Sequence, residues 1–190
     1  MDELRIVSGK YKGRSLKSPE GKGTRPLLTR LRKSLADILR PRLPGCRVLD
    51  VFGGTGAISF ELLSNGAEEA VIVELDPAAA SIIKENARKL GAPVNVMTGD
   101  ALAAVDLLWA SKRLFDIVVV APPYGLGLQK KTMDALSAKP LLRQGGTAIV
   151  QREAAEPFWE AVQPLEHERT RKYGRTVFDF YTIGSGGNND

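Results

Sequence analysis

Three acidic residues, Asp50, Glu74 and Asp100, each stand at the end of a short apolar run of the kind that forms a β-strand. The first run continues into a glycine-rich turn, Gly53–Gly56, and then into a helical pattern of apolar residues. Glycines let a ligand approach the backbone closely, and the N–H groups at the start of the following helix face that ligand. Because ligands bind at the carboxyl ends of the strands in parallel sheets, these residues predict a ligand site.

The charge of the acids indicates which ligand. A dinucleotide-binding turn needs the pattern G-x-G-x-x-G, but counting from Gly54 the third glycine is replaced by Ser59. A carboxylate at Asp50 repels a pyrophosphate and attracts the sulfonium and ammonium groups of S-adenosylmethionine. In that interpretation Asp50 holds the methionine end, directly or through water, Glu74 accepts both ribose hydroxyls, and Asp100 takes the adenine amino group. The alternative is that each acid only caps a helix, which is easier to accept for one acid than for three at successive strand ends.

A second motif, Ala121-Pro122-Pro123-Tyr124, follows the apolar run Phe115–Val120. Two prolines fix φ and remove two N–H donors, so the carbonyl groups are left to accept hydrogen bonds. Acceptors beside an aromatic ring suit a planar base with an exocyclic amine, because the ring stacks on the base while the acceptors hold the amine near a methyl donor. The alternative is a rigid turn with a packed tyrosine.

Strands and helices alternate around these motifs. We predict strands over about 46–52, 70–75, 94–98, 115–120 and 147–151, and a hairpin of two more strands near 165–172 and 176–183. Helices are predicted over about 28–39, 56–65, 77–90, 101–111, 128–138 and 154–163. This alternation predicts an α/β fold with a doubly wound, mostly parallel seven-stranded sheet and helices on both faces.

The 190 residues are expected to divide into three parts. Residues 1–45 form a basic extension, in which a small β-hairpin over residues 4–18 precedes the first helix. Residues 46–183 form the main domain, and the Gly/Asn-rich residues 184–190 form a disordered tail.

The composition excludes several classes of protein. A single cysteine, Cys46, rules out an internal disulfide framework, and one cysteine with one histidine, His167, argues against a zinc site. No apolar run is long enough for a membrane span and no export signal is visible, so we expect a cytoplasmic monomer without a resident metal.

Positive charge is concentrated in the first quarter of the chain. Residues 1–47 hold thirteen Lys/Arg and four Asp/Glu, a net charge of +9, whereas the whole chain carries +5. A basic arm on a mildly acidic domain suggests a polyanionic partner, although a solvated basic surface is the alternative.

The chain resembles the bacterial 16S ribosomal RNA guanine-N2 methyltransferases of the RsmD type, within the class I S-adenosylmethionine-dependent methyltransferases. The resemblance covers residues 4–183. It rests on the segments Arg5–Gly9, Gly13–Leu16, Thr24–Pro26, Val48–Gly56, Glu74–Asp76, Asn86, Gly99–Asp100 and Pro122–Tyr124. It implies a Rossmann-like fold and methyl transfer to the N2 amine of a guanine in small-subunit RNA, either free or in an assembled particle. S-adenosyl-L-homocysteine is the expected product, formed by direct transfer without a covalent enzyme intermediate.

The resemblance also assigns residues to roles. The catalytic motif is Ala121, Pro122, Pro123 and Tyr124. The donor site comprises Asp50, Phe52, Gly53, Gly54, Thr55, Gly56, Glu74, Leu75, Asp76, Asp100 and Ala101. Contacts to RNA phosphates fall to Arg5, Lys10, Lys12, Arg14, Arg25, Arg30, Arg32, Arg171, Lys172 and Arg175.

Ala121 departs from the family pattern, which has Asp at this position. The missing side chain would accept a hydrogen bond from the target amine and stabilise the charge that develops on nitrogen. Losing one such group costs about two to three powers of ten in rate. Ala121 therefore keeps open a catalytically impaired relative that binds RNA or ribosomal particles. The Pro-Pro-Tyr turn keeps open a second alternative, a DNA adenine-N6 methyltransferase.

Overall fold

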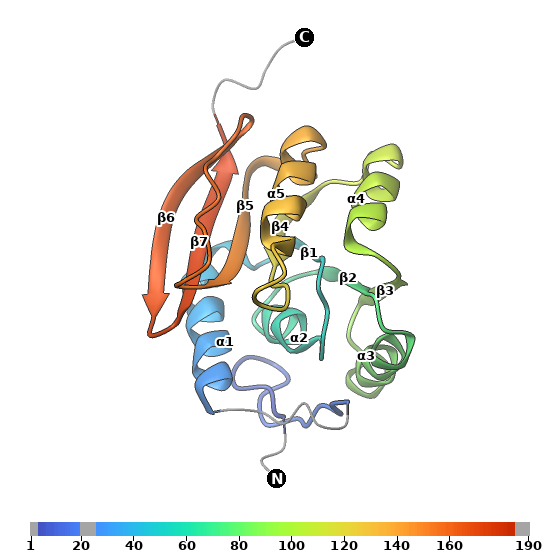
Figure 1. Cartoon of the computed structure of the whole chain (residues 1–190). Coiled ribbons are helices and arrows are strands. Elements are labelled where there is room, and N and C mark those ends of the chain that lie inside the picture. The colour runs from blue at the N-terminus through green and yellow to red at the C-terminus, as the bar shows by residue number, and fades with distance from the viewer. Residues whose placement is uncertain (1–3, 20–25, 185–190) are drawn as a thin grey trace. The chain divides into compact units, whose positions relative to one another are not determined.

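The computed structural model describes residues 4–19 and 26–184 (Figure 1). The chain forms two compact units. Unit 1 takes in Met1–Val48 and Gly53–Gly99, and unit 2 takes in Leu49–Phe52 and Asp100–Asp190. The predicted division at residues 45 and 183 stays a prediction.

The described residues contain six helical segments and seven strands. The helices are α1 (Pro26–Leu39), the short 3₁₀ helix η1 (Arg40–Arg42), α2 (Ala57–Ser64), α3 (Pro77–Leu90), α4 (Ala101–Ala110) and α5 (Leu128–Ala138). The strands are β1 (Arg47–Asp50), β2 (Glu69–Glu74), β3 (Val94–Thr98), β4 (Phe115–Val120), β5 (Leu142–Glu153), β6 (Leu165–Tyr173) and β7 (Thr176–Ile183). They form one mixed sheet in the order β3-β2-β1-β4-β5-β7-β6, which confirms the predicted seven-stranded α/β fold. No helix among the described residues is long and apolar enough to cross a membrane.

In unit 1, β2 and β3 pair in parallel, from Ala70 opposite Val94 to Glu74 opposite Thr98. Helix α3 packs against both strands. Its start follows from its sequence, because the Asp76 side chain accepts the Ala78 N–H at 2.9 Å and Pro77 needs no hydrogen-bond partner.

The N-terminal residues fold back on themselves and dock on α2. A single antiparallel bridge joins Arg5 to Ser15, so the predicted hairpin is present in its shortest form. The turn is anchored by Glu61 of α2, which accepts the Val7 N–H at 3.0 Å and the Ser8 N–H at 2.8 Å.

Glu61 is buried, and so is its charge partner Arg32 on α1. The Arg32 Nη1 atom lies 3.7 Å from Glu61 Oε2, and both Arg32 Nη atoms donate to the Arg5 carbonyl. Burial lowers the pKa of the Arg32 guanidinium, and the Glu61 charge raises it. The pair links α1, α2 and the N-terminal turn, because both charges are shielded from water and each needs its partner.

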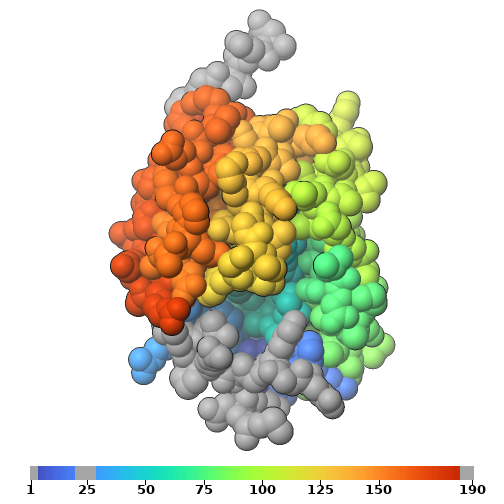
Figure 2. Space-filling model, in the orientation of Figure 1, coloured from blue at the N-terminus to red at the C-terminus, as the bar shows by residue number. Residues whose placement is uncertain are grey.

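In unit 2, α5 packs against β5, and β6 and β7 form an antiparallel hairpin. β4 and β5 are parallel, and β7 is antiparallel to both β5 and β6. β7 is buried along most of its length, whereas β6 alternates little and is largely exposed. Figure 2 shows this hairpin (orange to red) beside α5 (yellow) at the surface.

The predicted helix over residues 154–163 is wrong, because this segment is irregular. Several of its carbonyl groups accept hydrogen bonds from side chains of other elements instead of from N–H groups within a helix. Tyr181 Oη donates to the Trp159 carbonyl at 2.9 Å, and Ser137 Oγ of α5 contacts the carbonyls of Val162 and Gln163 at 3.0 Å each. The strand predicted over 147–151 is too short, because β5 begins at Leu142. Its pairing with β4 shifts in register between Leu142 and Thr147, a stretch that contains the two consecutive glycines 145 and 146.

Replacing Glu61 by Ala should lower the free energy of unfolding by about 3–5 kcal/mol, because the change leaves Arg32 buried without its counter-charge and two N–H groups without acceptors. Urea unfolding of the full chain measures the loss. The control is Glu68→Ala, an exposed change that should stay within about 0.5 kcal/mol of wild type. Equal stability of the two variants would contradict the account of the N-terminal anchor.

Candidate active site

The glycine turn of unit 1 lies tightly against the end of β2. The Gly53 N–H donates to the Val73 carbonyl at 2.7 Å, and a Cβ atom on Gly53 would lie 2.5 Å from Ile72 Cγ2. Gly54 has a φ of +56°, and Gly56, with a φ of +73°, precedes the first residue of α2. Side chains are therefore excluded at Gly53 by packing and disfavoured at Gly54 and Gly56 by conformation.

Glu74 is fixed in this turn by two backbone groups. Its Oε2 atom accepts the Gly54 N–H at 2.6 Å, and its Oε1 atom accepts the Asp76 N–H at 2.9 Å. An ionised carboxylate offers about four acceptor positions, so about two are left for a ligand. A carboxylate held in place beside a glycine turn, where no side chain stands in the way, can accept hydrogen bonds from a vicinal diol such as that of a ribose.

In unit 2, Asp50 and Asp100 differ in exposure and in role. Asp50 is buried, and its Oδ1 atom accepts the Phe52 N–H at 3.2 Å. Asp100 is exposed and caps α4, since its Oδ1 atom accepts the N–H groups of Leu102 at 2.9 Å and Ala103 at 3.1 Å. Asp100 therefore caps a helix, which was the alternative role that the sequence left open. Its carboxylate can still accept further hydrogen bonds.

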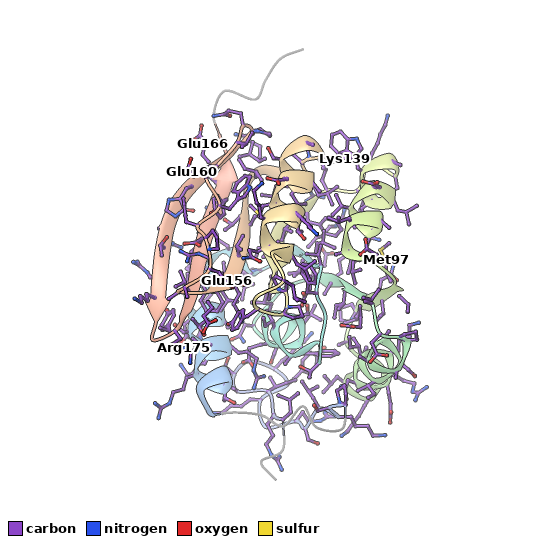
Figure 3. All side chains as sticks on the ribbon, in the orientation of Figure 1. Met97, Lys139, Glu156, Glu160, Glu166 and Arg175 are labelled. Atoms are coloured by element: carbon purple, nitrogen blue, oxygen red, sulfur yellow. The ribbon has the colours of Figure 1, made fainter. Side chains whose placement is uncertain are left out.

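The Pro-Pro-Tyr turn after β4 is fixed by residues that come later in the chain. Tyr124 is 40% exposed, so its ring is not packed into the core. Its hydroxyl accepts a hydrogen bond from Gln151 Nε2 at 2.8 Å, and the neighbouring Gly125 N–H donates to Glu156 Oε1 at 2.6 Å. Figure 3 shows Glu156 after β5, toward the end of the hairpin that carries Arg175. Gln151 and Glu156 were not predicted as site residues, because nothing in their neighbouring sequence marks them.

The remaining predicted donor-site residues differ in exposure. Leu75 and Asp76 are exposed, Phe52 and Thr55 are partly buried, and Ala101 is the buried first residue of α4. Among the described residues, no group of three or more His, Cys, Asp or Glu is arranged to hold a metal ion.

The predicted phosphate-binding residues separate by burial. The exposed ones are Arg5, Lys10, Lys12, Arg14, Arg30, Arg171, Lys172 and Arg175. Arg25 lies outside the described residues. Arg32 is buried and bonded within unit 1, so we leave it out of the RNA-binding set.

Comparison with known proteins identifies the family. The family described as conserved hypothetical protein 95 matches residues 4–182 of the chain. The chain belongs to this family, that of the RsmD-type methyltransferases.

Relatives match the chain over nearly its whole length. The Ribosomal RNA small subunit methyltransferase D of Escherichia coli K12 is 28% identical over 99% of this chain and 94% of its own. The solved structure of hypothetical protein TTHA0928 from Thermus thermophilus is 32% identical, with a TM-score of 0.81 over 95% of this chain and 99% of that one. The structure of the methyltransferase SMU.776 complexed with SAH is only 14% identical, with a TM-score of 0.63 over 80% of this chain and 49% of that one, and shows the fold alone. The RsmD-type chain thus has the class I methyltransferase fold.

Glu156→Ala should release the turn that carries Tyr124, because Gly125 loses its acceptor. We expect the Gly125 amide to exchange with solvent roughly tenfold faster or more, which hydrogen-exchange NMR measures. The control is Glu160→Ala, an exposed change on the same segment. Unchanged exchange at Gly125 in the Glu156 variant would show that Glu156 does not hold the turn.

Proposed function

We propose that this RsmD-type protein transfers a methyl group from S-adenosylmethionine to the N2 amine of a guanine in small-subunit ribosomal RNA. The observation that carries the proposal is the Glu74 carboxylate, held by the N–H groups of Gly54 and Asp76 beside the glycine turn. It is supported by membership of the family and by the name of the Escherichia coli relative, which acts on small-subunit ribosomal RNA. The protein would work in the cytoplasm as a monomer, on free RNA or on a ribosomal particle.

The proposed donor site is built from the acids that follow the strands. Glu74 accepts hydrogen bonds from the ribose hydroxyls, Asp50 attracts the positively charged methionine end, and Asp100 accepts from the adenine amino group. Gly53–Gly56, with Phe52, Thr55, Leu75, Asp76 and Ala101, would border the nucleoside. Bound S-adenosylmethionine would supply a methyl group on a positively charged sulfur. These residues fit such a ligand better than they fit a dinucleotide, because Asp50 would repel a pyrophosphate.

The proposed acceptor site is the turn after β4. The carbonyls of Ala121 and Pro122 accept hydrogen bonds from the target amine and direct its lone pair, while the Tyr124 ring stacks on the base. The prolines contribute by fixing the backbone. Because Ala121 lacks a carboxylate, the amine has only backbone acceptors at this turn, which predicts slow transfer rather than none.

Ala121→Asp should raise the rate of methyl transfer by about two powers of ten, because the new carboxylate stabilises the charge that develops on nitrogen. The assay uses S-adenosylmethionine labelled in its methyl group and unmodified small ribosomal subunits, followed by nucleoside analysis. The wild type should label N2-methylguanine slowly. Ala110→Asp, which adds the same charge at the exposed end of α4, should behave as wild type.

Each other outcome of this assay rejects the proposal in a definite way. If only the Ala121→Asp variant labels N2-methylguanine, the natural chain is an impaired relative that binds RNA. If the label appears in N6-methyladenine of duplex DNA presented in parallel, the protein is an adenine methyltransferase.

Exposed basic residues of the β6–β7 hairpin should contact RNA phosphates. Replacing Arg171 and Lys172 by Ala should weaken RNA binding and reduce the slope of log affinity against log salt by about 0.7 for each lost contact. Binding titrations at several salt concentrations measure this slope. Lys84→Ala on α3, also exposed, should leave the slope unchanged, and an equal effect of both changes would remove the hairpin from the RNA-binding set.

A further inference from the structure

The hydroxyl of Tyr124 is held between two side chains of the β5–β7 pair. Gln151 lies opposite Phe178, and Thr176 lies opposite Glu153, so Gln151 and Thr176 occupy diagonal positions on the same face of the two strands. Tyr124 Oη lies 2.8 Å from Gln151 Nε2 and 3.4 Å from Thr176 Oγ1.

These two contacts determine where the proton of the Tyr124 hydroxyl points. An amide nitrogen only donates, so the Gln151 contact uses a lone pair of the Tyr124 oxygen. The Tyr124 proton must then point elsewhere. Thr176 Oγ1 is a poor acceptor for it, because 3.4 Å exceeds the usual 2.5–3.0 Å of an O–H···O bond. Tyr124 as a whole is 40% exposed, and its contact with Gln151 lies at the surface, so the hydroxyl is open to a ligand.

The backbone next to Tyr124 is fixed as well. The Gly125 N–H donates to Glu156 Oε1, while Glu156 Oε2 accepts the Glu153 N–H at 2.7 Å. The ion pair of Arg152 Nε with the buried Asp179 Oδ2, 2.6 Å apart, holds this part of β5 on β7, and Arg152 Nη1 donates to the Glu156 carbonyl at 3.0 Å. Tyr124 therefore has little freedom to turn its hydroxyl by moving its backbone.

We propose that Gln151 is a positioning residue that makes Tyr124 a hydrogen-bond donor to an oxygen acceptor of the target nucleotide. The inference rests on the proposed function and adds the polarity, or direction, of the hydrogen bond between Tyr124 and the nucleotide. The ring stacks on the base, so the O–H, which lies in the plane of the ring, donates to an oxygen of the nucleotide beyond the edge of that base. A nucleotide that presents a donor there meets the Tyr124 proton and is disfavoured.

Variants that keep or reverse the polarity test the proposal. Gln151→Glu keeps the size of the side chain but supplies only acceptors, so Tyr124 donates to it and loses its proton for the ligand. Gln151→Met removes the hydrogen bond and leaves the Tyr124 proton available. Tyr124→Phe removes the hydroxyl. Each variant is assayed with small ribosomal subunits for KM and kcat.

We expect Tyr124→Phe and Gln151→Glu each to lower kcat/KM roughly tenfold, mainly by raising KM, because the bond to the nucleotide is present before methyl transfer. Gln151→Met should lose only about twofold, as the ring becomes less well fixed. In a Tyr124→Phe background, Gln151→Glu should cost nothing more, which separates the polarity from repulsion between the new carboxylate and RNA.

A spectroscopic measurement tests the polarity without any activity. The ¹³Cζ resonance of Tyr124, assigned by its absence in Tyr124→Phe, should move downfield in Gln151→Glu, where the phenol donates to a carboxylate, and less in Gln151→Met. No movement in Gln151→Glu would overturn the inference, and so would a Gln151→Glu variant with wild-type kinetics.

The failure of the proposed function gives a different result. If wild type and Ala121→Asp both transfer no methyl group, that function falls. The same Tyr124 and Gln151 variants are then compared by their dissociation constants for the small subunit, and equal constants would overturn the inference by themselves.

Discussion

The close approach of Gly53 to β2 is the constraint on which unit 1 depends. With no Cβ at this position, the Gly53 N–H reaches the Val73 carbonyl and the turn lies against Ile72. The next N–H, that of Gly54, is thereby directed at the Glu74 carboxylate, which a second N–H from Asp76 orients. The fixed acceptor thus depends on three backbone N–H groups, two from the glycine turn and one from Asp76, and neither a larger residue at 53 nor a shorter β2 would preserve it.

Unit 2 achieves a similar rigidity by other means. The Pro-Pro-Tyr turn has two residues without N–H groups, so its own backbone can offer few internal hydrogen bonds. Its position is set by β5 and by the irregular segment after it, through Gln151 and Glu156. The ion pair of Arg152 with the buried Asp179 keeps those groups in place. The length of β5 and its pairing with β7 therefore matter to the turn as much as the motif does.

Local signals explain which parts could be predicted from the sequence. Helix α3 begins at an Asp-Pro pair and ends at Gly91, whose φ is +62°, and the structure has it over Pro77–Leu90 as predicted. The strand over Phe115–Val120 is apolar throughout except at Asp116, as expected of a strand buried on both faces. In both cases the information lies within the element itself.

Long-range contacts explain the rest. The segment over 154–163 has helix-forming residues, but Pro157 interrupts it and its carbonyls bond to Tyr181 and Ser137. Arg32 has the charge of an RNA contact, but Glu61, 29 positions away, pairs with it in the interior. The pairing of Arg32 with Glu61 is not visible in neighbouring residues, whereas Pro157 is a local signal against the predicted helix. The ligand roles of Asp50, Glu74 and Asp100 are proposed from the chemistry of carboxylates. In the structure each of these side chains accepts a hydrogen bond from a nearby backbone N–H group.

Calorimetric titration of the wild-type protein with S-adenosylmethionine, S-adenosylhomocysteine and NAD tests the central claim most directly, because it asks what the acids at the strand ends recognise. We expect one-to-one binding of both S-adenosyl compounds, weakened by Glu74→Ala, and no binding of NAD. Binding of NAD as tight as that of S-adenosylmethionine, or no binding of either S-adenosyl compound, would contradict it.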